Sequence, residues 1–461
     1  MRKRLILFLG LILLSAAVLA VGVGTIDAGR DDIIVTQQTL QGDCSAAQGL
    51  QVAVLVNENR NLIWNTTFAA TAAERAETEF AFYNNYEDAQ DIASHRDIYL
   101  NVGNVNFGMH SSRDLLDEES VMHRPHEMLL PAKDVASRTP NGETRTEQLQ
   151  LNRFYPYYPI GLDSNWIYVE PEGGMEQAVV DALTDCFRIP VPDSHWVEIS
   201  VTKDDVGHVV EIYSEDVISE EPSYTYGSTV CTDDAVYLMI SGNQDYSQFR
   251  DGYGLYRIPL VELTSWGEVT FFTPQTTYDV EHMELVYAMD PVYGNEVTLR
   301  NGMDERELLL FEQTEDGMRM LVIDTETAEL CQTMELNWEH APNVWYHEDL
   351  MILGDRDHGS DIGLLQVYQK VNDRYELWLD TDFYPLNEEG YLYNNIVFAF
   401  DGTRLAIADF TKVYSAASLR ILVYDANGLC YAGEYHFSCD ELTEPLSTFN
   451  LDKPLQISWI E

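Results

Sequence analysis

LLLFEQTEDGMRMLVIDTETAEL, from Leu308 to Leu330, is the stretch that decides the fold of this chain. Two apolar runs are joined by a turn that contains glycine, and an acidic turn then leads into a third run. Short apolar runs bounded by turn residues are typical of β-strands. The stretch therefore predicts an antiparallel hairpin followed by another strand.

The hairpin recurs along the chain. The ends of the apolar strands are 64, 47 and 54 residues apart, and the tight turns before those strands are 69, 46 and 53 residues apart. The strand ends are Pro259, Ile323, Lys370 and Tyr424. The turns lie at Asp233, Gly302, Glu348 and Asp401. Because two separate landmarks have nearly the same spacing, we interpret residues 225 to 440 as four consecutive repeats.

Each repeat holds four short strand-like runs, and one four-stranded sheet cannot bury both of its faces. Stacking such sheets radially solves this problem, so we predict an all-β fold, a β-propeller of about seven four-stranded blades. The runs LLLF and LVYDA are apolar at consecutive positions, which suits sheets covered on both faces. Asp401-Gly402 predicts a tight hairpin turn in which both residues have positive φ.

The remaining blades are expected upstream, where strands are less regular. LQISWI near the C-terminus is expected to pair with an N-terminal strand such as QVAVLV, so that residues 455–460 complete the first blade. The polar segment 108–150 is expected to be a long loop inserted in the propeller. The alternative architecture is an irregular α+β domain up to about Asp193, followed by a smaller β domain.

Two segments resemble known propeller blades. FAFDGTRLAIAD, from Phe398 to Asp409, resembles the Asp-Gly hairpin of WD40-like propellers of the TolB type. VIDTETAEL, from Val322 to Leu330, is similar to the strand-Asp-x-x-Thr turn of quinoprotein-like and YVTN-type blades. The resemblance covers residues 228–436 and implies the propeller fold. It carries over no site residue, because blades of this kind serve many functions.

The first thirty residues predict export. Arg2, Lys3 and Arg4 precede an uncharged apolar run from Leu5 to Ile26. A spanning helix needs about 20 apolar residues, and a secretory signal has a shorter apolar region. Residues 1–30 are therefore expected to be a signal peptide or an N-terminal membrane anchor. Residues 31–461 would form the extracytoplasmic, propeller-like domain, either anchored at the cell membrane or secreted.

The charge excludes some partners. With 77 acidic and 27 basic residues the formal net charge is −50, which repels nucleic acid and anionic membrane surfaces. We therefore expect no nucleic-acid partner, and contact with a membrane only through the N-terminal apolar segment. A protein or a glycan at the cell surface is the expected partner, and the oligomeric state stays open.

Two stretches are candidate sites. The aromatic cluster FYPYYP offers Phe154, Tyr155, Tyr157 and Tyr158 as a platform for a sugar or a proline-rich peptide. Packing of these rings in the core or at a blade edge is the preferred interpretation. In DRDHGSD the carboxylates of Asp355, Asp357 and Asp361 alternate along a tight turn, a pattern that suits calcium. A solvated turn is the preferred interpretation of this acidic loop, so no cofactor is expected apart from this candidate calcium ion.

No catalytic motif is found: the exported part has no nucleophile elbow, no phosphate-binding loop and no dinucleotide fingerprint. The function expected from the sequence is that of a binding or scaffold propeller. The alternatives are a sensory or regulatory ectodomain, and a carbohydrate-active hydrolase or lyase. Paired carboxylates of a glycosidase stay open, because their separation is spatial.

Overall fold

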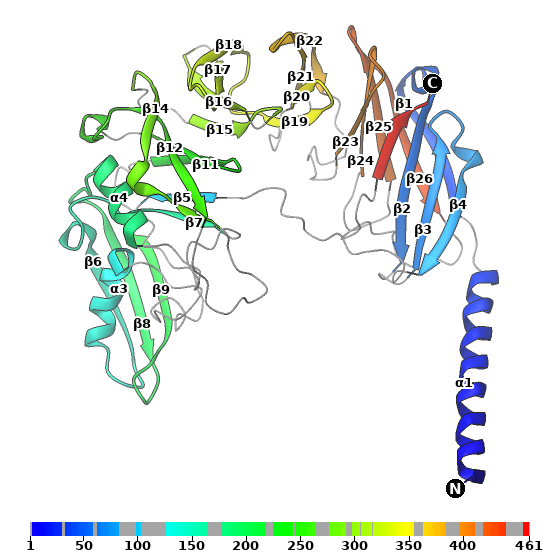
Figure 1. The fold of residues 1–461 in the computed structure, drawn as a ribbon, viewed down its shortest axis with the longest axis horizontal. Helices are drawn as coiled ribbons and strands as arrows, with labels where there is room; N and C mark the ends of the chain where they lie inside the picture. The colour runs from blue at the N-terminus through cyan, green and yellow to red at the C-terminus, as the bar shows by residue number, and fades with distance from the viewer. Residues whose placement is uncertain are drawn as a thin grey trace. The chain divides into compact units, whose positions relative to one another are not determined.

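The structure is a computed structural model (Figure 1). It describes residues 2–29, 33–58, 62–82, 98–102, 126–164, 177–217, 225–242, 245–262, 276–291, 297–304, 306–315, 317–354, 363–383, 396–410, 418–438 and 455–460. The chain divides into two compact units, one formed by Met1–Ile92 with Pro342–Glu461 and the other by Ala93–Ala341. We call them unit 1 and unit 2. The single domain expected over residues 31–461 stays a prediction.

Unit 2 contains the first two repeats. Each is an antiparallel sheet whose strands follow one another in the chain. The first sheet consists of β10 (Thr225–Cys231), β11 (Ala235–Gly242), β12 (Gly254–Glu262), β13 (Thr276–Tyr278) and β14 (Glu284–Ala288). The second consists of β15 (Val297–Asn301), β16 (Glu307–Thr314), β17 (Gly317–Asp324) and β18 (Leu330–Leu336).

Unit 1 contains the other two repeats. The third sheet consists of β19 (Asn343–His347), β20 (Leu350–Gly354), β21 (Gly363–Val371) and β22 (Arg374–Phe383). The fourth contains β23 (Val397–Phe400), β24 (Arg404–Phe410), β25 (Ser418–Asp425) and β26 (Gly428–Ser438). The four turns that mark the repeat each lie between the first and second strands of a sheet. Four consecutive antiparallel sheets between residues 225 and 440 are therefore confirmed. The four strands predicted for each sheet are found in the second and third, whereas the first and fourth have five.

The fourth sheet is covered on both faces, as its consecutive apolar residues predict. Along β25, Leu419 and Ile421 pack into a core shared with a sheet formed by the two ends of the chain. Their neighbours Leu422 and Tyr424 pack into a separate core shared with the third sheet. All four side chains are fully buried. Side chains alternate between the two faces of a strand, so burial at successive positions requires a neighbour on each side.

Strands from the two ends of the chain pair with each other's sheets. The C-terminal β27 (Leu455–Trp459) pairs with β2 (Leu50–Glu58), and the sheet continues through β3 (Leu62–Ala69) and β4 (Glu77–Phe82). The red C-terminal strand lies beside the blue β2 in Figure 1. This confirms the pairing predicted for LQISWI. The structure adds an exchange that the sequence did not predict: β1 (Ile34–Gly42) extends the fourth sheet by pairing with β26.

The Asp401-Gly402 turn differs from the prediction. Gly402 has φ +89°, but Asp401 is not among the described residues with positive φ. Three residues separate β23 from β24, and the Asp401 carboxylate accepts hydrogen bonds from the backbone N–H groups of Thr403 and Arg404, at 2.9 and 2.7 Å. A three-residue loop needs only one left-handed residue. The turn with two positive φ angles occurs instead at Asn372-Asp373, with φ +50° and +60°.

Ala328 occupies a left-handed backbone position, with φ +57°, in the turn between β17 and β18. Its N–H donates to the carbonyl of Asp324 at 2.9 Å, so the turn needs this conformation. A Cβ atom makes the left-handed region unfavourable by about 1–2 kcal/mol. We expect Ala328→Gly to raise the free energy of unfolding by about 0.5–1 kcal/mol in chemical denaturation, after the greater backbone freedom of glycine is subtracted.

The control for this prediction is Ala178→Gly at an exposed position of helix α4 (Gln177–Phe187). This substitution should lower the free energy of unfolding by about 1 kcal/mol, because glycine is less favourable than alanine in a helix and positive φ is not needed there. Equal destabilisation by both substitutions would contradict the account of the turn.

The N-terminal half of unit 2 is not a four-stranded blade. Strands β6 (Thr144–Gln150), β8 (Trp196–Lys203) and β9 (Val209–Val217) form a three-stranded sheet, and β5 (Ile98–Val102) pairs with β7 (Ile160–Ser164). Helices α3 (His126–Arg138) and α4 contribute buried residues to the core of this unit. An α+β element is thus present, although in the middle of the chain rather than at the N-terminal end that the alternative architecture expected.

The long loop expected over 108–150 is corrected for its described part. Residues 126–150 contain α3 and β6, and residues 108–125 lie outside the described residues. The polar composition was misleading because α3 buries one face, with Leu129, Ala132 and Val135 fully buried, and exposes the other.

At the N-terminus, Arg2–Gly29 forms helix α1. Among the residues that the structure describes, no helix has both the length and the hydropathy to span a membrane.

Candidate functional site

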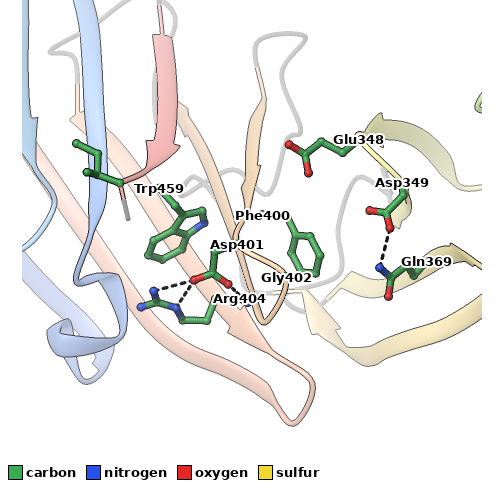
Figure 2. Close-up of a pocket in the computed structure, with 9 residues that line it drawn as sticks. Glu348, Asp349, Gln369, Phe400, Asp401, Gly402, Arg404 and Trp459 are labelled. Carbon is green, nitrogen blue, oxygen red and sulfur yellow. Dashed lines mark hydrogen bonds and ion pairs between the residues drawn. The ribbon is translucent and has the colours of Figure 1, made fainter.

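A hollow of 630 Å³ in unit 1 is the candidate site, and we call it the turn hollow (Figure 2). Two of its walls are the turns between the first and second strands of the third and fourth sheets, and β21 and the end of β27 supply the rest. Its lining residues are Glu348, Asp349, Gln369, Phe400, Asp401, Gly402, Arg404, Trp459 and Ile460. Short turns at the ends of packed strands hold these groups on a rigid scaffold.

One side of the turn hollow is an arginine whose hydrogen bonds are satisfied within the protein. The Nε atom of Arg404 donates to Oδ2 of Asp401 at 2.8 Å, and Nη2 lies 2.7 Å from the same oxygen. Nη1 donates to the backbone carbonyls of Ala46 and Gln48, at 2.7 and 3.2 Å. The guanidinium carbon also lies 4.0 Å from the centre of the Trp459 ring. Arg404 therefore joins the fourth sheet to the sheet that contains β27 and β2.

The acid partner of this arginine stays ionised. Burial raises the pKa of Asp401, but the hydrogen bonds donated by Thr403 and Arg404 outweigh burial, so the pKa lies below its usual range. The side chain of Trp459 is fixed as well, because its Nε1–H donates to the carbonyl of Ala399 at 3.2 Å. This side of the hollow is therefore neutral overall. We call the contacts of Arg404 with Asp401, Ala46, Gln48 and Trp459 the clamp.

The opposite side carries negative charge. Glu348 and Asp349 come from the β19–β20 turn, where Glu348 has φ +52°. Oδ2 of Asp349 accepts a hydrogen bond from the side-chain amide of Gln369 at 2.7 Å, and this partner is uncharged. Figure 2 shows these groups across from the Asp401–Arg404 pair, with Phe400 between the two sides.

The charges of the lining residues do not cancel. Three carboxylates and one guanidinium give a net −2, and that guanidinium is held by Asp401. Burial lowers the pKa of the neighbouring His347, so at neutral pH this imidazole supplies no compensating charge. Carboxylates beside an aromatic ring can receive an ammonium or guanidinium group. The arrangement is therefore suited to binding a cationic group.

The predicted aromatic platform is only partly available. Tyr155 and Tyr158 are 3% and 5% exposed and belong to the core of unit 2, whereas Phe154 and Tyr157 are half-buried. The hydroxyl of Tyr158 lies 2.6 Å from Nδ1 of His195, so it is held within the protein. The sequence could not separate the four rings, because adjacent aromatic residues in an irregular segment have no periodicity that shows which of them are buried.

The predicted calcium ligands Asp355, Asp357 and Asp361 lie outside the described residues. Across the described part of the chain, no group of three or more His, Cys, Asp or Glu side chains is arranged to hold a metal ion. Calcium binding by this loop stays a prediction.

The turn hollow was missed as a site. Glu348 and Asp401 mark the repeat in the sequence, but their turns were interpreted only as landmarks of the fold. The usable signal was that corresponding turns of successive repeats are both acidic, at Glu348-Asp349 and at Asp401. Corresponding turns of stacked sheets lie at the same end of the stack, so their charges gather there.

The fold is mostly β, with several four-stranded antiparallel sheets, which is consistent with a β-propeller. The fold and the turn hollow together define a repeat β protein with a polar site that is lined by carboxylates and two aromatic rings.

Comparison with known proteins does not assign the chain to a family. No protein-family model matches the chain, and no curated protein matches it. Among solved structures, the chain is similar to hydrazine synthase from Kuenenia stuttgartiensis, with 10% identity and a TM-score of 0.23, over 51% of this chain and 61% of that chain. It thus spans about three fifths of that structure.

Two further solved structures are similar over more of the chain. TolB from Acinetobacter baumannii matches with 10% identity and a TM-score of 0.24, over 94% of this chain and 84% of that chain. A protein from Lactobacillus plantarum matches with 8% identity and a TM-score of 0.27, over 84% and 99%. At TM-scores this low, these likenesses carry no argument about function.

Proposed function

We propose that this protein is a binding or scaffold protein that engages another protein through the turn hollow, which receives a basic side chain of the partner. The observation that carries the proposal is the pair Glu348 and Asp349 beside Phe400. Among the described lining residues the one base, Arg404, is already held by Asp401 and does not compensate this pair. A chain of net charge −50 also attracts basic surfaces over long distances, which speeds their association.

A protein partner is favoured over a glycan by the charge of the site. A neutral sugar gains nothing from two negative charges, whereas a lysine or arginine gains a charge-assisted hydrogen bond. The hollow is also small compared with a protein interface, so it would accept one anchoring side chain at the centre of a larger contact.

The setting of the proposal comes from the sequence. We propose a propeller of about seven blades, displayed outside the cytoplasm and either anchored by the N-terminal apolar segment or secreted. The basic residues before that segment and its apolar length support this location.

We expect the double variant Glu348→Gln, Asp349→Asn to bind a hexalysine peptide about tenfold more weakly than the wild type at low ionic strength. Removing both carboxylates takes away the local attraction while preserving the shape of the side chains. The measurement is isothermal titration calorimetry of the full chain.

The matched control is Glu77→Gln, Glu79→Gln on β4, where both residues are exposed and the net charge changes by the same amount. Strand β4 lies at the opposite edge of its sheet from β27, which lines the hollow. It should reduce affinity less than twofold, because exposed charges at a distance are screened. Equal losses in the two double variants would show that only the overall field binds the peptide. Displacement of the peptide by a neutral oligosaccharide such as maltopentaose would indicate a glycan site instead.

A further inference from the structure

A second hollow, of 250 Å³, lies in unit 2, and we call it the aromatic hollow. One wall is the aromatic and proline segment that follows β6, and the other is the exposed side of α4 with the start of α3. Its lining residues are Glu127, Phe154, Tyr155, Pro156, Tyr157, Pro159, Val180, Asp181, Thr184 and Asp185.

The aromatic wall is held in place by backbone contacts. The N–H of Tyr158 donates to the carbonyl of Ile189 at 2.8 Å, and the N–H of Val191 donates to the carbonyl of Pro156 at 3.2 Å. Tyr157 forms an isolated antiparallel bridge with Pro190. A surface fixed in this way loses little conformational entropy when a ligand docks on it.

The composition of this wall suits a proline ring. The half-buried Phe154 and Tyr157 line the hollow together with the exposed Pro156, and the Phe154 and Tyr155 rings are 6.4 Å apart with a tilt of 49°. Extended proline-containing segments dock on aromatic-lined grooves, because their backbone is already ordered before binding. The volume is below the roughly 300–1,000 Å³ of pockets that enclose a small molecule, so the hollow fits one or two residues of a peptide.

The polar wall retains a negative charge at its edge. Asp185 is neutralised by Arg188 at 2.5 Å and by Arg250 at 3.8 Å. The exposed Asp181 differs, because its Oδ1 accepts a hydrogen bond from the uncharged side-chain amide of Gln177 at 2.8 Å. Asp181 is therefore placed to receive a basic residue next to a proline on the rings.

We propose that the aromatic hollow is a second docking site, for an extended peptide segment in which a basic residue adjoins a proline. The proline packs on Phe154 and Tyr157, and the basic group reaches Asp181. This inference concerns unit 2 and goes beyond the function proposed for the turn hollow. A sugar ring would also stack on the aromatic wall, but the charge at Asp181 adds nothing for a neutral sugar, so the peptide is favoured.

The test is titration of an acetylated Pro-Pro-Arg-Pro-Pro amide into the full chain. The protein carries Glu348→Gln and Asp349→Asn, so that failure of the turn hollow cannot be mistaken for failure of this site. We expect the peptide to bind about fivefold more tightly than the same peptide with Gln in place of Arg. Asp181→Asn should abolish this difference, and Tyr157→Leu should weaken both peptides about tenfold.

Two controls test whether the effects are specific. Tyr157→Phe should bind both peptides as the protein with Tyr157 does, unlike Tyr157→Leu, because it keeps the aromatic ring. Glu211→Gln, at an exposed position of β9, should leave both affinities unchanged. The proposal is overturned if neither peptide binds, if Asp181→Asn leaves the preference for arginine intact, or if maltopentaose binds with the same dependence on Tyr157 while the peptides do not.

Discussion

Deleting residues 451–461 should lower the thermal unfolding temperature of unit 1 by about 10 °C or more, since it removes β27 from the sheet that contains β2. The register runs from Leu50 opposite Trp459 to Val54 opposite Leu455, so β2 loses its outer partner along five residues. Leu455 is 2% exposed, and removal of such a side chain from a core costs about 2–5 kcal/mol before any hydrogen bond is counted.

Differential scanning calorimetry of the full and truncated chains measures this effect. The control is Gln456→Ser, an exposed substitution on the same strand, which should leave the transition within about 1 °C of the wild type. An unchanged melting curve after truncation would mean that β27 is a dispensable edge and that the strand exchange does not hold unit 1 together.

Replacing Arg404 by alanine should lower the free energy of unfolding by about 2–3 kcal/mol. The substitution leaves Asp401, whose side chain is 18% exposed, without its ion-pair partner. It also leaves the carbonyls of Ala46 and Gln48 without the Nη1 donor, and it uncovers the face of Trp459. The expected cost is below that of a fully buried pair, because the Arg404 side chain is 30% exposed.

Arg404→Lys should recover only part of this loss in urea denaturation, because an ammonium group cannot reproduce the planar, multiple hydrogen bonding of a guanidinium. The control is Arg374→Ala at an exposed position of β22, with an expected change below about 0.5 kcal/mol. If Arg404→Ala and Arg374→Ala cost the same, the clamp contributes nothing.

The clamp also predicts a dependence on pH. The pKa of Asp401 is lower in the folded protein than in the unfolded chain, because hydrogen bonds from Thr403 and Arg404 outweigh the effect of burial. The stability that Asp401 contributes is therefore complete above the unfolded pKa and is lost as the pH falls through the folded pKa. Arg404→Ala should thus cost less in acid than at neutral pH.

The sequence alone determined the order and antiparallel pairing of the four sheets between residues 225 and 440, but not the fifth strand of the first and fourth sheets. This was achievable because strands and turns alternate locally. The spacing of turns such as Asp233 and Asp401 can be recognised although the residues between them differ from one repeat to the next. The sequence also identified the C-terminal strand and its partner, since an unpaired strand at each end of a repeat chain has few other strands with which it can pair. Burial on both faces of β25 followed from its consecutive apolar residues.

Only the tertiary structure decided how distant segments meet. The contact between Arg404 and the carbonyl of Ala46 joins residues 358 positions apart, and no local pattern encodes it. The pairing of β1 with the fourth sheet and the helix-covered sheet of unit 2 were likewise not predicted, and the sequence did not show which rings of the aromatic cluster are buried. Hydrophobic periodicity shows which face of an element is apolar, but not which other element covers it. The candidate sites depend on that second choice, because each is formed by segments that packing brings together.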